Sequence, residues 1–409
     1  MIPFSPPRID QNIIDEVTDA LRSGWITTGP RTKRFEANLA AYCEVPAVLC
    51  LSSATAGLEV MLRWFGVGPG DDVIVPAYTY AATANVIVHC GATPVFVDVD
   101  ADDFNISLEA VAGAFTSRTK AVMPVDLGGW PCDYDELNDL VREKSGMFTP
   151  ATGEQEMLGR AMVLADAAHS IGARYKGRRT GGLCDVSVFS FHAVKNLTTA
   201  EGGAVALNLP EPFSNEDLYK TLCVKTLHGQ NKDALAKTQK GNWRYDIVEA
   251  GFKCNMTDLV AAIGLVELER YDSDTLVQRR RIMRAYSDAL GRYSWAQLPF
   301  FDRDGRTSSC HLYPLRIRGI DEATRDAIIQ GIFDREVSVN VHYIPVPRMS
   351  FYRSLGYEMA DYPIAWDNYA REISLPVYYD LGDDDVQTVV RAVVDSVEQV
   401  LSERATPGE

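Results

Sequence analysis

The amino-acid sequence predicts an α/β protein: a doubly wound, mostly parallel sheet in a large domain, followed by a smaller α+β domain. Short apolar segments alternate with helix-patterned segments through the first half of the chain. The apolar segments carry almost no polar residues, which is typical of parallel strands buried on both faces. The chain has 409 residues, enough for a large core and two domains.

The first domain begins with two helix-patterned segments. Apolar residues recur at helical spacing through residues 10–23, and the pattern stops at Gly24. Residues 25–30 then form a loop, and residues 32–43 predict a second helix. The elements expected after them are strands at 47–51, 72–75, 93–97, 121–125 and 161–165, a strand from 187 and another at 204–207, with helices after residue 57 and at 134–144.

A long helical segment at residues 259–293 marks the expected passage to the second domain. We therefore expect a large domain at 1–257 and a small one at 258–409. The elements expected in the small domain are strands near 310–317 and 337–341 and helices at 321–335 and 383–404.

Two stretches suggest exposed surface. Residues 146–159 are polar and rich in glycine and threonine, which predicts an exposed insertion between a helix and a strand. Residues 279–281 are three consecutive arginines, which we interpret as the solvated face of a helix rather than a binding patch.

The charge balance excludes some functions. A net charge of −16 and a sequence pI near 4.9 argue against sequence-independent binding of nucleic acid, which needs a basic surface. A small anionic ligand is compatible with this charge, because it needs only a few local cations or helix N-termini.

The cysteines and the apolar runs point to a cytoplasmic protein. The eight cysteines are scattered without a C-x-x-C pair or a Cys/His spacing that suits zinc, so we expect reduced, mostly buried thiols and no metal. The first residues are too poor in apolar side chains for a signal peptide, and no run of 18 apolar residues predicts a transmembrane helix.

The most informative stretch is residues 187–205. It begins as a strand, turns through Glu201-Gly202-Gly203 and enters another strand. Between the two strands lies Lys195, which has no acidic residue within five positions on either side. Apolar surroundings disfavour the ammonium form and lower the pKa, which prepares a lysine to act as a Schiff-base nucleophile. A snorkelling lysine on a surface loop is the alternative that these residues leave open.

Residues 52–57 predict an anion site. An apolar strand runs into small and hydroxyl residues (S-S-A-T-A-G), after which a helical pattern begins. The free N–H groups and the dipole of such a helix start attract a negative group. Serine and threonine are also the commonest N-caps, so an ordinary helix start is the alternative.

Polar residues follow several of the expected strands, among them Ser53, Tyr80, Asp126 and Asp166. Ligands of doubly wound sheets bind at the carboxyl ends of the strands. Only a hairpin-like segment and one strand separate Asp166 from Lys195. This interval brings both residues to the same edge of the sheet.

Two long runs of residues resemble a known family. The run S-F-H-A-V-K-N-L-T-T-A-E-G-G at 190–203 resembles the lysine motif of the DegT/DnrJ/EryC1/StrS sugar aminotransferases, and G-F-K-C-N-M-T-D at 251–258 resembles that family's G-Y-K-Y-N-M-T-D. The resemblance extends from Pro3 to about Pro376, nearly the whole chain. It implies the fold-type-I architecture of enzymes that use pyridoxal 5'-phosphate (PLP), with the pyridoxamine phosphate form as the intermediate state of the cofactor.

The resemblance also implies residue roles. Lys195 would carry the cofactor, Asp166 would pair with its pyridinium nitrogen, and Tyr80 would stack on its ring. The residues expected to hold the cofactor or its phosphate are Ala54, Thr55, His169, Ser190 and, from a neighbouring subunit, Asn255. The residues expected to line the substrate pocket are His192, His342 and Tyr343. Ala54 replaces the glycine usual at this turn, which keeps the backbone N–H donors.

The residues alone leave other roles open. Tyr80 also suits an aromatic core position at a helix start, and Asn255 or Thr257 also suits a helix cap. A lone histidine such as His342 is more often structural.

The resemblance implies a ping-pong transamination in a homodimer with shared active sites. The amino donor would be L-glutamate, and the acceptor a keto group, at C4, of a UDP-linked 4-keto-6-deoxy-N-acetylhexosamine for surface polysaccharide. A 3-keto or dTDP-sugar aminotransferase is one alternative. A dehydratase of the same family is disfavoured by Lys195, because those enzymes have histidine there. A non-catalytic regulatory or binding protein on this fold is the alternative from another class.

Overall fold

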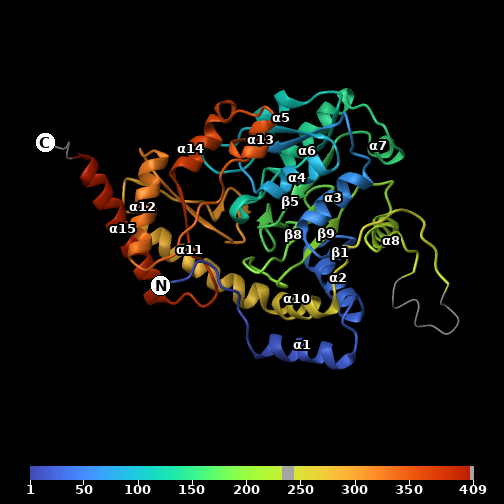
Figure 1. The fold of residues 1–409 in the computed structure, drawn as a ribbon, viewed down its shortest axis with the longest axis horizontal. Coiled ribbons are helices and arrows are strands. Elements are labelled where there is room, and N and C mark those ends of the chain that lie inside the picture. The colour runs from blue at the N-terminus through green and yellow to red at the C-terminus, as the bar shows by residue number, and fades with distance from the viewer. Residues whose placement is uncertain (233–243, 406–409) are drawn as a thin grey trace.

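The computed structural model describes residues 1–232 and 244–405. A seven-stranded sheet, ordered β1-β9-β8-β5-β4-β2-β3, forms the centre of the larger part of the molecule (Figure 1). Strand β9 is antiparallel to its two neighbours, β1 and β8. All the other neighbouring strands are parallel to one another. The predicted mostly parallel α/β sheet is therefore confirmed.

Most of the expected elements of the sheet are present within a few residues. The strands are β1 (Ala47–Leu51), β2 (Asp72–Pro76), β3 (Thr93–Val97), β4 (Thr119–Val122), β5 (Met162–Asp166), β8 (Val186–Ser190) and β9 (Gly203–Leu207). The helices around them are α1 (Gln11–Ser23), α2 (Pro30–Cys43), α3 (Ala54–Trp64), α4 (Ala81–His89), α5 (Leu108–Ala114), α6 (Tyr134–Glu143), α7 (Gly153–Leu158), α8 (Asn215–Lys225) and α10 (Asp258–Arg270). Of these, the sequence patterns predicted no residue range for α4, α5, α7 and α8.

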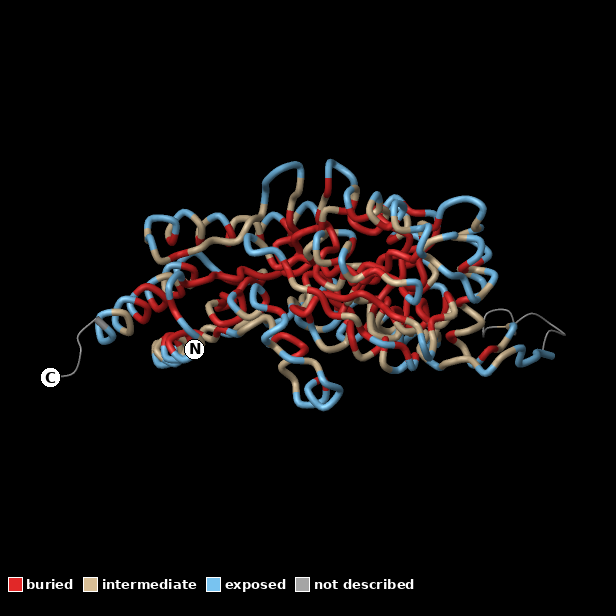
Figure 2. Tube along the Cα trace, turned by 90° about the horizontal axis from the view of Figure 1, so that it is seen from above, coloured by how far each residue is buried: buried red, intermediate tan, exposed pale blue. Residues whose placement is uncertain are grey.

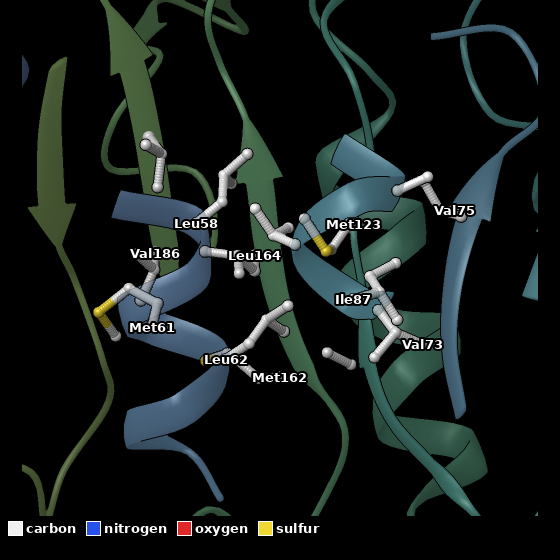
Figure 3. Packing of buried hydrophobic residues seen from close by; sticks show 14 of the residues in the cluster. Leu58, Met61, Leu62, Val73, Val75, Ile87, Met123, Met162, Leu164 and Val186 are labelled. Carbon is white, nitrogen blue, oxygen red and sulfur yellow. The ribbon is translucent and has the colours of Figure 1, made fainter. Parts of the chain in front are cut away.

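Both faces of the sheet are apolar because both are covered. In β5, Met162 and Leu164 belong to the hydrophobic core on the side of α3 and α4, whereas Val163 belongs to the core on the side of α5 and α6. Figure 3 shows Leu58 and Met61 of α3 with Met162 and Leu164 of the sheet. This double coverage explains why the strands lack the alternation of polar and apolar residues that a half-exposed sheet shows.

A second core lies in the C-terminal part of the chain. Its members come from residues 282–397 and surround the small sheet of β10 (Ala296–Gln297), β13 (Tyr313–Ile317) and β14 (Glu372–Leu375). The helices α11 (Leu276–Leu290), α12 (Glu322–Asp334) and α15 (Asp383–Ala405) gather at this end (Figure 1). Figure 2 shows buried chain running through both ends of the elongated molecule.

The two cores do not divide at one residue. Residues of α10 pack with α2 in a core under the large sheet, and Tyr352 and Tyr369 pack against the core that contains α3. The division into 1–257 and 258–409 therefore stays a proposal, and residues 233–243 and 406–409 of these ranges lie outside the described residues.

The long helical segment is present but not uniform. Helix α10 passes through a π-helical turn, Tyr271–Thr275, into α11. Such turns change the direction of the side chains that follow. Among the residues described, no helix is both long and apolar enough to span a bilayer.

Three expectations need correction. Residues 337–341 form only isolated bridges, to Ile2 and to Ser374, rather than a strand. Residues 146–159 are not simply an exposed loop, because α7 forms there and the buried Gln155 amide donates to the Phe65 carbonyl oxygen. Arg279 is not solvated: it is buried, and its guanidinium donates to the carbonyl oxygens of Cys310 and His311. Local sequence could not reveal these tertiary partners.

Candidate active site

The carboxyl ends of the large sheet open on a cavity of about 340 Å³. Strands β1, β2, β5 and β8 all end there, and the segment around residue 342 closes the opposite side. The predicted site residues that line the cavity are Ala54, Thr55, Tyr80, Asp166, His169, Ser190, His192, Lys195, His342 and Tyr343. Ten of the eleven predicted residues therefore meet in one place, and Asn255 is the exception.

The start of α3 forms one end of the cavity. The Ser53 hydroxyl caps the helix by accepting from the Ala56 N–H at 3.1 Å. The N–H groups of Ala54 and Thr55 precede the first helical hydrogen bond, so they are available to an anion at the positive end of the helix dipole. Ser190, at the end of β8, lines the same cavity.

A glycine lets β9 pass close beneath this helix start. A Cβ atom built on Gly203 would lie only 2.3 Å from the Ala54 nitrogen. Any side chain at this position would displace the backbone of the turn. Gly203, the second glycine of the E-G-G run, therefore leaves room for the backbone of the turn that forms the anion site.

Asp166 ends β5 and is buried at the cavity wall. Its carboxylate accepts from the Thr83 hydroxyl at 2.7 Å and from the Ala168 N–H at 3.2 Å. Burial raises the pKa of Asp166, and the hydrogen bonds from Thr83 and Ala168 oppose this rise. A carboxylate held in this way is suited to pair with a buried cationic ring nitrogen.

Lys195 is half-buried at the cavity wall. Its backbone N–H donates to the His192 carbonyl oxygen at 2.8 Å, which closes a tight turn after β8. Burial lowers the pKa of Lys195 to about 8, and the charge of Asp166 partly opposes this. The prediction that the apolar surroundings lower the pKa of this lysine agrees with its environment.

The residue after the lysine anchors its turn to the second core. The Asn196 amide donates to the Ser309 carbonyl oxygen at 2.7 Å, and its oxygen lies 2.8 Å from Nδ1 of His311. Sequence reasoning missed both Asn196 and Thr83. Each lies close in sequence to a predicted site residue, but only the fold shows its partner.

His169 lies under the cavity with a defined ring orientation. The Gly128 N–H donates to its Nδ1 at 3.2 Å, so the ring proton is on Nε2. Nε2 lies 3.1 Å from the Tyr343 hydroxyl and therefore donates to it. Burial and the nearby Lys195 hold the pKa of His169 well below its usual range, so the ring is neutral.

Tyr80 and His192 are the most exposed members of the predicted set. The Tyr80 ring is 61% exposed, and its centroid lies 5.5 Å from that of Tyr343. The core alternative for Tyr80 is therefore wrong. The His192 ring is near the Glu201 carboxylate, at 3.7 Å.

Asn255 lies outside the cavity of its own chain. Its side-chain amide donates to the Thr28 hydroxyl at 2.5 Å, and its backbone forms an isolated antiparallel bridge with Leu51. It does not cap α10, whose N-cap is Thr257. Its service to a neighbouring subunit stays a prediction.

The arrangement fits PLP. A helix start and a serine hydroxyl face one end of the cavity, a buried carboxylate another, and a lysine of lowered pKa lies in the wall. The cofactor's phosphate, ring nitrogen and aldehyde need these three groups. Among the residues described, no group of three or more histidine, cysteine, aspartate or glutamate side chains is arranged to hold a metal ion.

Solved structures and curated proteins resemble the chain along nearly its whole length. A putative sugar aminotransferase from Streptococcus pneumoniae matches with a TM-score of 0.95 and 44% identity in its PMP form, over 98% of this chain and 100% of that one. Its PLP form matches with a TM-score of 0.93 and 43% identity, over 98% and 99% of the two chains. The spore coat polysaccharide biosynthesis protein SpsC of Bacillus subtilis is 39% identical over 403 residues, 97% of each chain.

The fold, the cavity and these relatives define a PLP-dependent sugar aminotransferase of fold type I. The chain belongs to the DegT/DnrJ/EryC1/StrS aminotransferase family, whose profile matches residues 7–394. A more distant member of the same structural group is PseC of Helicobacter pylori, an aminotransferase involved in the biosynthesis of pseudoaminic acid, with a TM-score of 0.86 and 26% identity over 97% of this chain and 99% of that one.

Proposed function

We propose that the enzyme transfers the amino group of L-glutamate to the C4 keto group of a UDP-linked 4-keto-6-deoxy-N-acetylhexosamine, in the cytoplasm, for surface polysaccharide. The similarity to a spore coat polysaccharide protein supports the pathway class. The observation that carries the proposal is the meeting of Lys195, Asp166 and the α3 N-terminus around one cavity.

Each of these groups has a proposed task. The N–H groups of Ala54 and Thr55 and the Ser190 hydroxyl hold the phosphate, and the Asp166 carboxylate keeps the ring nitrogen protonated. Bound PLP supplies an electron sink for the pair released when a C–H bond beside nitrogen breaks. Lys195 carries the cofactor and afterwards moves the proton at that carbon as an amine. Its lowered pKa keeps a useful fraction of the amine form near neutral pH.

The test has two stages. The purified protein is titrated with PLP while its visible spectrum is recorded, and L-glutamate is then added. We expect the band of lysine-bound PLP to give way to that of the pyridoxamine form. UDP-4-keto-6-deoxy-N-acetylglucosamine is then added, and we expect it to restore the first band and to yield a UDP-amino sugar.

The alternatives predict other results. A band that glutamate leaves unchanged would refute the donor. If a dTDP-linked or a 3-keto sugar restores the band of lysine-bound PLP instead, the 3-keto or dTDP-sugar aminotransferase alternative is favoured. Absence of any band would favour the non-catalytic protein.

We also propose a homodimer in which Asn255 reaches the phosphate of the partner's site. Lys195→Ala and Asn255→Ala variants, each impaired alone, are mixed under conditions that exchange subunits. Shared sites would restore activity, because the mixed dimer contains one site with both native residues. Failure of the mixture to gain activity would contradict shared sites.

A further inference from the structure

A hydrogen-bonded chain connects a buried carboxyl group to the cavity. Its members are Glu372 and Ser374 of β14 and His342 of the cavity wall. The Ser374 hydroxyl lies 2.5 Å from Oε1 of Glu372 and 2.8 Å from Nδ1 of His342. The other oxygen of Glu372 accepts from the backbone N–H of His342 at 2.9 Å. The three groups therefore form a continuous hydrogen-bonded path, and the backbone N–H of His342 holds the carboxyl group of Glu372 in place at one end.

The outer end of this path opens on the cavity. His342 lines the cavity beside Lys195. Among the described residues, Nε2 of His342 has no hydrogen-bond partner. This nitrogen is not fully buried either, so a ligand in the cavity can reach it. The Phe4 ring stacks on the imidazole at 5.4 Å, and the Tyr78 hydroxyl donates to the His342 carbonyl oxygen at 2.8 Å. These contacts hold the ring in place.

The inner end is a carboxyl group without an ion-pair partner. Glu372 is fully buried, and within residues 1–232 and 244–405 no cationic nitrogen lies within 4.0 Å of its carboxylate. The charged or titratable groups that face it are Arg316 of β13, Arg325 of α12, Tyr78, His342 and Tyr343. Burial raises the pKa of Glu372 to about 8, against the opposing effect of its hydrogen bonds and the two arginines.

The polarity of the path depends on the proton of Glu372. When the carboxyl is protonated, its O–H donates to Ser374, Ser374 donates to Nδ1, and the imidazole carries its proton on Nε2. When the carboxylate is ionised, Ser374 donates to it and Nδ1 carries the ring proton, so Nε2 presents a lone pair. Burial and the charge of Lys195 lower the pKa of His342 to about 3, so the ring stays neutral in both states.

We propose that Glu372, Ser374 and His342 form a proton relay that delivers a proton to the oxygen of the keto sugar when nitrogen replaces it. This inference rests on the proposed function only for the identity of the acceptor sugar. The step is balanced: the Nε2–H bond breaks as an O–H bond forms on the sugar oxygen, Nδ1 takes the Ser374 proton, and Ser374 takes the Glu372 proton. The relay reloads in reverse, with a proton released by the incoming nitrogen. His342 is the group that touches the substrate, and Glu372 and Ser374 are positioning residues.

The test uses a substitution that fixes the polarity without changing shape. In Glu372→Gln the amide oxygen must face the His342 N–H, so the NH₂ group must face Ser374 and hold Nε2 protonated. Nitrogen-15 NMR of the histidine rings in the PLP-loaded protein, with His342→Gln used for assignment, reports the tautomer. We expect wild-type His342 to change from Nε2–H to Nδ1–H as the pH rises through about 8. We expect Glu372→Gln to remain Nε2–H throughout.

Kinetics supply the second readout. Because Glu372→Gln keeps the donor at Nε2 but has no proton to pass on, we expect kcat of the half-reaction with UDP-4-keto-6-deoxy-N-acetylglucosamine to fall about 100-fold with little change in KM. Ser374→Ala breaks the path and should lower kcat similarly. Ser396→Ala, which removes a buried serine hydroxyl that donates to the Ala392 carbonyl oxygen within α15 and is not part of this path, is the matched control and should change neither kcat nor KM.

The outcomes separate the relay from the proposed function. A wild-type tautomer that does not change with pH, or a Glu372→Gln tautomer that still does, would overturn the relay even in an active enzyme. A tautomer that changes as expected while kcat in both variants stays at the wild-type value would overturn proton delivery. If the wild-type enzyme does not use this sugar, the proposed acceptor is wrong, whereas the NMR result still decides the relay.

Discussion

The two walls of the cavity are built by different means. On the sheet side, the start of α3, Asp166 and Lys195 stand where strands end, and backbone geometry places them. On the C-terminal side, His342 and Tyr343 are held by side chains of residues distant in sequence, such as Ser374 and His169. The difference teaches that a cofactor site can be fixed by backbone topology, whereas the substrate side depends on side-chain partners. Five predictions test this contrast, from the largest expected effect to the smallest.

Lys195→Ala should abolish the band of lysine-bound PLP and reduce transamination by about 10⁴-fold, because both attachment and proton transfer depend on this amine. Lys220→Ala, which removes an exposed lysine of α8, is the control and should behave as wild type. A retained visible band in Lys195→Ala would show that another lysine carries the cofactor.

Gly203→Ala should lower the free energy of unfolding by about 3 kcal/mol and weaken PLP binding, because its Cβ would meet the backbone of the anion site. Gly113→Ala is a suitable control, since a Cβ at that helical glycine meets nothing within 4 Å. Urea denaturation and PLP titration measure both effects. Equal stability of the two variants would contradict the close approach.

Thr83→Val should weaken PLP binding by about 10-fold, because the Asp166 carboxylate loses a hydrogen bond and its pKa rises further. Thr83→Ser keeps the hydroxyl and should bind PLP nearly as the wild type does. Spectroscopic titration gives both dissociation constants. If the valine and serine variants bind equally, the hydroxyl has no role in holding the carboxylate.

The rate of PLP attachment to the apoenzyme should rise with pH and level off above about 8, because only the neutral amine of Lys195 attacks the aldehyde. Below this pKa the rate should fall by about 10-fold per pH unit as the ammonium form dominates. Stopped-flow absorbance between pH 6 and pH 9.5 measures it. A rate that still climbs about 10-fold between pH 8.5 and pH 9.5 would show that burial does not lower the pKa of Lys195.

Tyr343→Phe should raise KM for the keto sugar about 5-fold and leave the glutamate half-reaction unchanged, because it removes only the hydrogen bond with His169 and one polar group of the substrate wall. Steady-state and half-reaction kinetics separate the two effects. A slower glutamate half-reaction would place Tyr343 with the cofactor side instead.

Sequence patterns predicted the sheet side well. The strand-turn-helix at residues 52–57 and the lysine between two strands were identified because their signals are local. The sequence did not reveal the hydrogen-bond partners of Gln155, Arg279 and His342. Arg279 was interpreted as solvated, and residues 337–341 as a strand, because the sequence does not show what covers them.

The sequence by itself determined the α/β class, the family and the chemical types at the sheet edge, because apolar periodicity and the spacing of motifs are properties of neighbouring residues. Only the tertiary structure decided that Thr83 supports Asp166, that Asn196 ties the lysine turn to the second core, and that Glu372 reaches the cavity through Ser374. These contacts join residues far apart along the chain. The pKa values of Asp166, Lys195 and Glu372 shift only once the folded chain buries these groups.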